Sequence, residues 1–262
     1  MRVDYNTLRV APVKSGIIHL SLNRPSALNA INSVMMSELA HFWAELPSTD
    51  ARVVVLSGEG ERSFCAGADL KERRGLDEKT WRYQHAQLQH AMRLMVACPV
   101  PLIAAVNGYA FGGGLELVLA SDYALAAEHA QFALPEAKLG IMPGAMGTQL
   151  LPRAVGMRLA KQMIFSGKRL DAQQAKQVGI VVSVESASSL LERAFNEAEL
   201  IIQSAPLSLQ AIKKSINHAV AGDLLAGYEF EVEQYNALLS TDDRIEGISA
   251  FNEKRKPNFT GK

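Results

Sequence analysis

Short apolar or alternating runs recur along the chain as far as about residue 184, and helical patterns follow them. We predict strands from these runs, because strands of four to eight residues show alternation or full burial. The predicted strands are 17–22, 53–57, 102–106, 123–127 and 180–184. Helical spacing of apolar residues follows Ser33, recurs across 79–97 and continues after Gly114. The pattern predicts an α/β fold with right-handed βα units. The order of the elements along the sequence does not reveal whether the sheet is open, closed or spiral.

The pattern becomes helical from about residue 171 to the end of the chain. Apolar residues at helical spacing predict five helices, at 172–176, 188–204, 207–221, 223–239 and 243–254. Pro206 and Gly222 mark breaks between helices, since both residues favour helix ends and turns. We therefore expect a helical C-terminal region after the α/β part.

Three consecutive glycines open one of the apolar helices, in the run N-G-Y-A-F-G-G-G-L-E-L-V-L-A-S-D that ends at Asp122. Gly112, Gly113 and Gly114 let a ligand approach the backbone, and the amides of a first helical turn have no intrahelical partner. The positive end of the helix dipole also favours negative charge there. Glu116 lies on the same apolar helix, where an idle carboxyl would be unfavourable. The segment predicts an anion-stabilising site beside a carboxyl group.

Two further segments can contribute to such a site. The run S-F-C-A-G-A-D-L-K-E follows a predicted strand, and its small residues leave amides open. If the amides of Ala68 and Gly113 converge, they form a two-donor oxyanion hole; taken alone, the segment fits a tight βα turn equally well. Glu136 follows a proline in an apolar setting and has either a capping or ion-pair role or a catalytic one. Two carboxyls around one site can divide the roles of acid and base.

Composition and motif absences exclude several classes of protein. Lys and Arg together number 27 and Asp and Glu number 27, so no net charge attracts nucleic acid or an anionic membrane. Motifs of serine hydrolases, P-loop enzymes, dinucleotide oxidoreductases and zincins do not occur. Cys65 and Cys98 are far apart and predict packed, reduced thiols, and His85 and His90 are interpreted as surface or hydrogen-bonded residues. With no apolar run long enough to span a bilayer and no targeting pattern, we expect a cytoplasmic protein.

Taken together, these motifs resemble the crotonase, or enoyl-CoA hydratase/isomerase, superfamily. The resemblance covers nearly the whole chain and rests on five runs. They are L-N-R-P-S-A-L-N-A-I, F-C-A-G-A-D-L-K-E, P-L-I-A-A-V-N-G-Y-A-F-G-G-G-L-E-L, L-P-E-A-K-L-G-I-M-P-G and T-D-D-R-I-E-G-I-S-A-F-N-E-K-R-K-P. It implies a spiral of ββα turns over 1–195 and a helical trimerisation region over 196–262. It also implies an acyl-CoA thioester as the partner, a homotrimer or dimer of trimers, and no cofactor, since CoA is part of the substrate.

The resemblance also assigns roles to residues of this chain. The amides of Ala68 and Gly113 would stabilise an enolate oxyanion, and Glu116 and Glu136 match the two hydratase glutamates of the family. Because members with other chemistry commonly lack one glutamate, we expect hydration of a 2-enoyl-CoA, with Glu116 as base and Glu136 as acid. The implied CoA contacts are Ser26, Ala27, Leu28, Ala66, Ala68, Asp69, Leu70, Gly112, Gly113, Phe251 and Lys254.

Some positions depart from the commonest family pattern and leave the acyl preference open. Ser26 replaces a frequent lysine, and Phe111, Met146 and Leu150 replace residues that border or support the acyl pocket. The L-K-E-R-R-G run and the tail resemble the methylglutaconyl-CoA hydratase branch, and the tail also resembles a hydratase of phenylacetate degradation. A mammalian member of the first branch binds AU-rich RNA through a lysine-rich helix; the corresponding stretch here, 33–46, contains no lysine, so we do not expect RNA binding.

Alternative functions remain open at this point. The nearest enzymatic rival is a Δ3,Δ2-enoyl-CoA isomerase that uses one glutamate to move a proton, and a hydratase specific for methylglutaconyl-CoA is a narrower possibility. A non-catalytic scaffold that binds acyl-CoA or RNA belongs to another class. The presence of both Glu116 and Glu136 favours the hydratase over such a scaffold.

Overall fold

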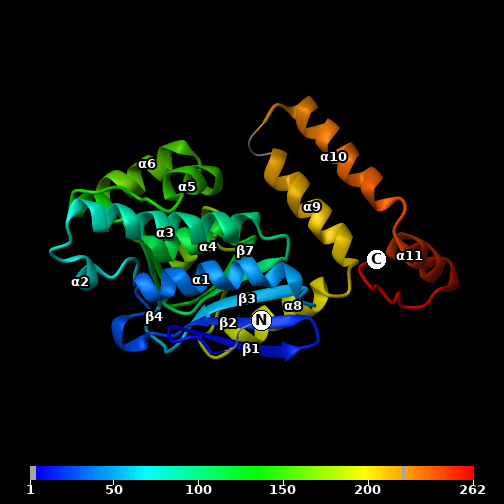
Figure 1. Cartoon of the computed structure of the whole chain (residues 1–262), viewed down its shortest axis with the longest axis horizontal. Coiled ribbons are helices and arrows are strands. Elements are labelled where there is room, and N and C mark those ends of the chain that lie inside the picture. Colours follow the sequence, from blue (N-terminus) through cyan, green and yellow to red (C-terminus); the bar gives the residue numbers. More distant parts are fainter. Residues whose placement is uncertain (1–3, 220–221) are drawn as a thin grey trace.

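The computed structural model describes residues 4–219 and 222–262, which form two sheets with helices around them (Figure 1). The larger sheet has the strand order β1-β2-β3-β5-β7-β10. Its strands are Leu8–Lys14, Ile17–Leu22, Val53–Gly58, Leu102–Val106, Tyr123–Ala127 and Ser183–Glu185. β1 and β2 are antiparallel, and the remaining neighbours are parallel. Parallel neighbours require long crossover connections, which the helices supply.

The smaller sheet has the order β4-β6-β8-β9, and its strands are very short. They are Ser63–Cys65, Tyr109–Phe111, Gln131–Ala133 and Leu170–Asp171. β4, β6 and β8 each directly follow a strand of the larger sheet, namely β3, β5 and β7. A helix follows β4 and β6 before the chain returns to the larger sheet. The repeated ββα unit is the spiral that the sequence resemblance implies.

The helices before residue 170 lie mainly on one face of the larger sheet (Figure 1). Their bounds are α1 Ser33–Glu45, α2 Leu70–Arg73, α3 Glu78–Ala97, α4 Gly113–Ala120, α5 Gly147–Val155 and α6 Met157–Ser166. Short 3₁₀ helices cover Pro25–Ala27 (η1), Leu46–Ser48 (η2) and Glu136–Leu139 (η3). The N-caps of α1 and α3, Asn32 and Asp77, accept hydrogen bonds from the first turns that follow them.

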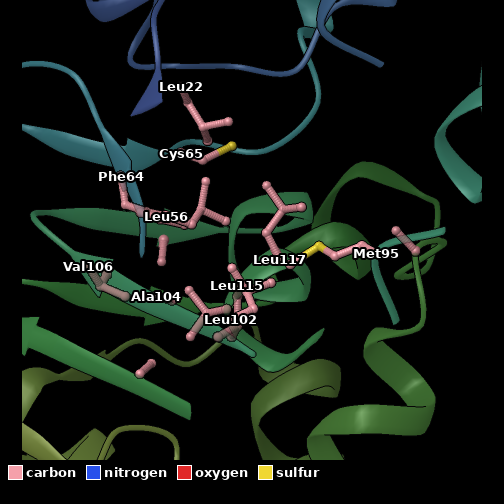
Figure 2. Packing of buried hydrophobic residues seen from close by; sticks show 14 of the residues in the cluster. Leu22, Leu56, Phe64, Cys65, Met95, Leu102, Ala104, Val106, Leu115 and Leu117 are labelled. Atoms are coloured by element: carbon pink, nitrogen blue, oxygen red, sulfur yellow. The ribbon is translucent and has the colours of Figure 1, made fainter. Parts of the chain in front are cut away.

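Alternation along the strands divides the core between the two faces of the sheet. Val54 and Leu56 belong to the cluster that packs with α1, α3 and α4, whereas Val53 and Val55 belong to the cluster that packs with α8. Figure 2 shows Leu56 in the first cluster, with Leu102, Ala104, Val106, Leu115 and Leu117. A strand buried on both sides needs apolar residues at every position. This explains why β3 and β5 could be predicted from the sequence.

Five helices follow β9 in the described part of the chain, with β10 between the first two, and the last three extend away from the sheets (Figure 1). They are α7 Ala172–Gln177, α8 Leu190–Ile201, α9 Pro206–Ala219, α10 Leu224–Leu238 and α11 Asp242–Glu253. The boundary predicted after residue 195 falls inside α8, whose Ala198 packs with the sheet, and the division into domains stays a prediction. α9 is tied to the core by Lys213, whose Nζ lies 2.8 Å from Asp122 Oδ2.

Large apolar side chains remain exposed on the extending helices. They are Ile212, Ile216, Leu224, Leu225, Tyr228, Tyr235, Ile245, Ile248 and Phe251, each more than half exposed. α10 packs with α9 and contains no buried residue among those described. Many large apolar side chains exposed on neighbouring helices are unusual for a surface that stays in water. None of the helices in the described part of the chain is long and apolar enough to cross a membrane.

Several elements differ from the sequence expectation. The strand predicted at 180–184 overlaps β10 only at its end, because Ile180 N donates to Ala175 O at the end of α7 and Val182 N donates to Ala124 O. The short strands of the smaller sheet, β1, α5 and α6 were not predicted. Three residues are too few to show a period of two, and β1 is largely exposed. Cys65 and Cys98 are free and buried, as expected.

Candidate active site

The glycine run lies where β6 meets the first turn of α4. Gly112 has φ +52°, in the region that L side chains rarely adopt. At Gly114 a Cβ would lie 2.0 Å from the carbonyl oxygen of Cys65, at the end of β4. Only glycine permits this contact, so the first turn of α4 lies directly against the segment that follows β4.

The amides of Ala68 and Gly113 lie close to one another. Ile31 N donates to Gly67 O at 2.8 Å and Asp69 N donates to Ile31 O at 2.9 Å, so the N–H of Ala68 falls outside this ladder. Gly113 is the first residue of α4, where an N–H has no intrahelical partner. A Cβ placed on Gly113 would lie 4.0 Å from Ala68 N. The arrangement is compatible with two donors to one oxygen atom.

Glu116 lies one turn into α4 and is 2% exposed. Its Oε1 atom accepts hydrogen bonds from Ala145 N and Gly147 N, both at 2.7 Å. Burial raises the pKa of Glu116 above its ordinary value, while these two N–H donors and His85 oppose that increase. Donors to a carboxylate stabilise its ionised form. The two hydrogen bonds from Ala145 and Gly147, the latter at the start of α5, also hold the Glu116 side chain in a fixed orientation.

Glu136 begins η3 and is 9% exposed. Its Oε1 atom lies next to Gly112, where a Cβ would be only 3.0 Å away, and its Oε2 atom is buried without a hydrogen-bond partner among the described residues. Burial and the nearby charge of Glu116 raise the pKa of Glu136 to about 7. A carboxyl with these properties holds its proton near neutral pH and can donate it.

The raised pKa of Glu136 predicts a pH-dependent gain in stability for Glu136→Gln. The folded state binds this proton more tightly than the unfolded state does, so the free energy of unfolding of the natural protein falls as pH rises from about 4.5 to about 7. Glutamine has no proton to lose, so the free energy of unfolding of the variant should rise relative to that of the natural protein between about pH 4.5 and about pH 7. Above about pH 7 this relative gain should reach at most about 3 kcal/mol. Denaturant unfolding of both proteins at pH 5 and pH 8 measures the change. A difference independent of pH would contradict it.

The two glutamates and the two amides line one cavity of about 700 Å³. Leu88 and Met92 contribute buried apolar surface, and Leu70, Leu139 and Met142 are exposed at its wall. The lining as a whole is mainly apolar with a few polar groups, as is usual for small-molecule sites. In the described parts of the chain, no group of three or more His, Cys, Asp or Glu side chains is placed to hold a metal ion.

One face of α3 forms a wall of this cavity, and sequence reasoning did not assign it to the site. The residues that line the cavity are Trp81, His85, Leu88, Gln89, Met92 and Arg93. Trp81, His85, Leu88 and Met92 follow one another at intervals of three or four residues, as on one helical face, and Gln89 and Arg93 lie beside them. His85 is hydrogen-bonded, as expected, with Nε2 3.0 Å from Gly144 O, but it is also part of the site. The helical spacing of these residues was visible in the sequence, but the fact that this face lines the cavity was not.

The predicted CoA contacts divide into residues that line the cavity and residues that do not. Ala66, Ala68, Leu70, Gly112 and Gly113 belong to the lining. Ser26, Ala27, Leu28 and Asp69 do not.

The carboxylate of Asp69 is already used within the fold. It accepts hydrogen bonds from Lys71 N and Glu72 N at the start of α2 and pairs with Arg24 at 2.9 Å. This side chain therefore shapes the turn that presents Ala68.

Phe251 and Lys254 lie at the end of α11, among the helices that extend away from the sheets (Figure 1). Phe251 is 84% exposed. Neither residue lines the cavity of its own chain, so the predicted CoA contact of these two residues stays a prediction.

Of the three departures near the expected acyl pocket, only Met146 lines the cavity. Phe111 stacks on Tyr109 with ring centroids 5.1 Å apart, beneath the guanidinium of Arg169. Leu150 lies in α5 outside the lining. Phe111 and Leu150 therefore do not border the cavity themselves, and a supporting role for them behind its wall stays a prediction.

Comparison with known proteins identifies the family to which this arrangement belongs. The family model described as enoyl-CoA hydratase/isomerase matches residues 13–262. The chain belongs to the enoyl-CoA hydratase/isomerase family. Its spiral fold is shared with the crystal structure of enoyl-CoA hydratase from Bacillus anthracis, which superimposes with a TM-score of 0.96 at 39% identity over 98% of this chain and 100% of that one. The crotonase-like fold predicted from the sequence is thus confirmed.

Relatives of known name within the enoyl-CoA hydratase/isomerase family also match nearly the whole chain. The 2,3-dehydroadipyl-CoA hydratase of Escherichia coli (strain K12) is 43% identical over 94% of this chain and 96% of its own length. The mitochondrial methylglutaconyl-CoA hydratase of Mus musculus is 38% identical over 94% of this chain and 80% of its own length. The chain is thus similar over nearly its whole length to enzymes that are named for acyl-CoA substrates.

Proposed function

We propose that this member of the enoyl-CoA hydratase/isomerase family is a 2-enoyl-CoA hydratase, which adds water reversibly to give a 3-hydroxyacyl-CoA. The observation that carries the proposal is the pair of buried carboxyls, Glu116 and Glu136, in one cavity with the converging amides of Ala68 and Gly113. The amides would stabilise the negative charge that develops on the thioester oxygen in the transition state. No cofactor is needed for this chemistry, because CoA is part of the substrate.

In the proposed reaction, Glu116 acts as the base and Glu136 as the acid. Glu116 removes a proton from water as the water oxygen bonds to C3, and the electrons of the double bond move toward the thioester oxygen. Glu136 then supplies a proton to C2, so that the product has gained one water molecule. Burial raises the pKa of Glu116, and its two N–H donors oppose that increase by stabilising the ionised form that a base requires; the pKa of about 7 leaves Glu136 protonated for a large fraction of molecules near neutral pH. Because the two carboxyls interact, the apparent pKa values seen in a pH–rate profile would describe the pair and not either residue alone.

Hydration and isomerisation are separated by one pair of assays. Purified protein is mixed with crotonyl-CoA, and loss of absorbance of the conjugated thioester measures hydration. A 3-enoyl-CoA is tested in parallel, where a gain of the same absorbance measures isomerisation. The proposal expects hydration to be the faster reaction by a wide margin. A protein that only isomerises would move the assignment to enoyl-CoA isomerase.

We further propose that the chain assembles as a homotrimer or a dimer of trimers through its C-terminal helices. Support comes from the exposed apolar side chains of α9, α10 and α11, which have no covering partner within the described part of the chain. A neighbouring subunit would also bring Phe251 and Lys254 to a CoA molecule. Light scattering at several protein concentrations tests the assembly. A cytoplasmic location, with no nucleic-acid or membrane partner, completes the proposal.

Lys254→Ala is expected to raise KM for crotonyl-CoA at low salt with little loss of kcat. The lysine directly follows the last residue of α11, three residues after the exposed Phe251, and a lysine that binds phosphate contributes to binding of substrate and transition state alike. Arg255 cannot readily replace it, because its guanidinium is paired with Glu246 and Glu253. The effect should shrink at moderate salt. Lys256→Ala serves as the matched control, and an unchanged KM for Lys254→Ala at low salt would remove this residue from the CoA site.

A further inference from the structure

The cavity contains a cation that the hydratase mechanism does not use. Arg73, the last residue of α2, lines the same cavity as Glu116 and Glu136. Its guanidinium carbon lies 4.9 Å from the centre of the Trp81 ring on α3. An aromatic face attracts a guanidinium group and limits its movement. The position of this charge is therefore fixed by two elements of the cavity wall.

The guanidinium of Arg73 has unused hydrogen-bonding capacity. Its Nη2 atom is inaccessible to solvent and has no hydrogen-bond acceptor among the described residues. Burial lowers the pKa of Arg73 and the charge of Glu72 opposes this change. The carboxylate of Glu72 is itself engaged, because it accepts from both the backbone N–H and the hydroxyl of Ser33. A buried donor without an acceptor is unfavourable, so this site favours a ligand that brings one.

The apolar lining of the cavity indicates which part of a ligand could bring that acceptor. Apolar side chains of Leu88 and Met92 line the same cavity, and such surface fits the carbon chain of an acyl group. A carboxylate at the far end of that chain would match the planar fork of a guanidinium with two parallel hydrogen bonds. The carboxyls of Glu116 and Glu136 are already assigned to water and proton transfer.

We propose that Arg73 selects enoyl-CoA substrates whose acyl chain ends in a carboxylate. The proposal rests on the hydratase function proposed above and names the substrate class of the same cavity. Arg73 binds the terminal carboxylate of the acyl group, Trp81 holds the guanidinium in place, and the apolar wall contacts the carbons between the two ends. A monocarboxylic acyl group of the same length would leave Arg73 without an acceptor.

Binding of non-reactive ligands tests the proposal independently of catalysis. Glutaryl-CoA and pentanoyl-CoA have the same number of acyl carbons, lack the double bond and differ in the terminal carboxylate. Calorimetry should show that the natural protein prefers glutaryl-CoA. In Arg73→Met the ratio of the two affinities should fall by about 10- to 100-fold, the range expected for a hydrogen bond to a charged group. Arg73→Gln provides a second variant that retains polarity if the methionine protein fails to fold.

Arg74→Met is the matched control, since Arg74 is exposed, adjacent in sequence and outside the cavity lining. It should leave the affinity ratio unchanged. An equal loss of affinity for both ligands in Arg73→Met would mean that Arg73 binds a phosphate of CoA, and an unchanged ratio would mean that it binds no carboxylate; either result overturns the proposal. Hydration of glutaconyl-CoA and 2-pentenoyl-CoA is then measured. If neither is hydrated while the binding preference persists, the hydratase proposal fails and the role of Arg73 stands.

Discussion

Glu116→Gln and Glu136→Gln are each expected to lower kcat for hydration of crotonyl-CoA by roughly 100-fold or more. Glutamine has nearly the shape of glutamate but neither accepts the proton of water nor returns one to C2, and removing a general acid or base has this order of effect. Both carboxyls are buried, and among the described residues that line the cavity no other Asp or Glu is present to replace them. Single-turnover and steady-state rates on purified, assembled protein measure the loss.

Glu38→Gln is a control for loss of a buried carboxylate as such. Glu38 is 6% exposed and accepts hydrogen bonds from Asn6 N and Thr7 N, much as Glu116 accepts two backbone N–H groups, but it does not line the cavity. This variant should lose stability while its folded molecules keep their turnover. If Glu116→Gln and Glu136→Gln retained natural kcat, the mechanism with two glutamates would be wrong.

Gly113→Pro is expected to reduce turnover by about 100- to 1000-fold, the usual cost of losing one donor of an oxyanion hole. Proline removes the backbone N–H that would meet the thioester oxygen. Gly113 is the first residue of α4, a position at which proline is tolerated in helices. The fold should therefore survive, which circular dichroism and light scattering check before the rates are measured.

Gly113→Ala separates the lost amide from added bulk. Its Cβ would lie 3.2 Å from Cδ1 of Ile31, a contact that a small movement of that side chain relieves, and the N–H is retained. The alanine protein should therefore lose much less activity than the proline protein. Equal losses in the two variants would assign the effect to crowding and remove Gly113 from the oxyanion hole.

Much of the larger sheet could be predicted from sequence because its strands are buried on both faces. Each position of β3 and β5 must be apolar or small, and such runs are recognisable without any partner. The same holds for the helices, where one buried face imposes a helical period on α1 and α3. Glycine at 112–114 and the carboxyl of Glu116 on an apolar helix likewise indicated a site from local chemistry alone.

The tertiary structure decided which of these segments are in contact with one another. The close approach of Gly114 to Cys65 depends on a pairing between β4 and β6, strands too short to show a period. The pKa of Glu136 depends on burial beside Glu116, and the open hydrogen-bonding capacity of Arg73 depends on the position of Trp81. The sequence by itself determined most strands of the larger sheet, most of the helices, the family resemblance and the residues able to do chemistry, because propensity and burial act on each segment. Distances, pKa values and the shape of the cavity came only from the fold, because they depend on contacts between segments far apart in the chain.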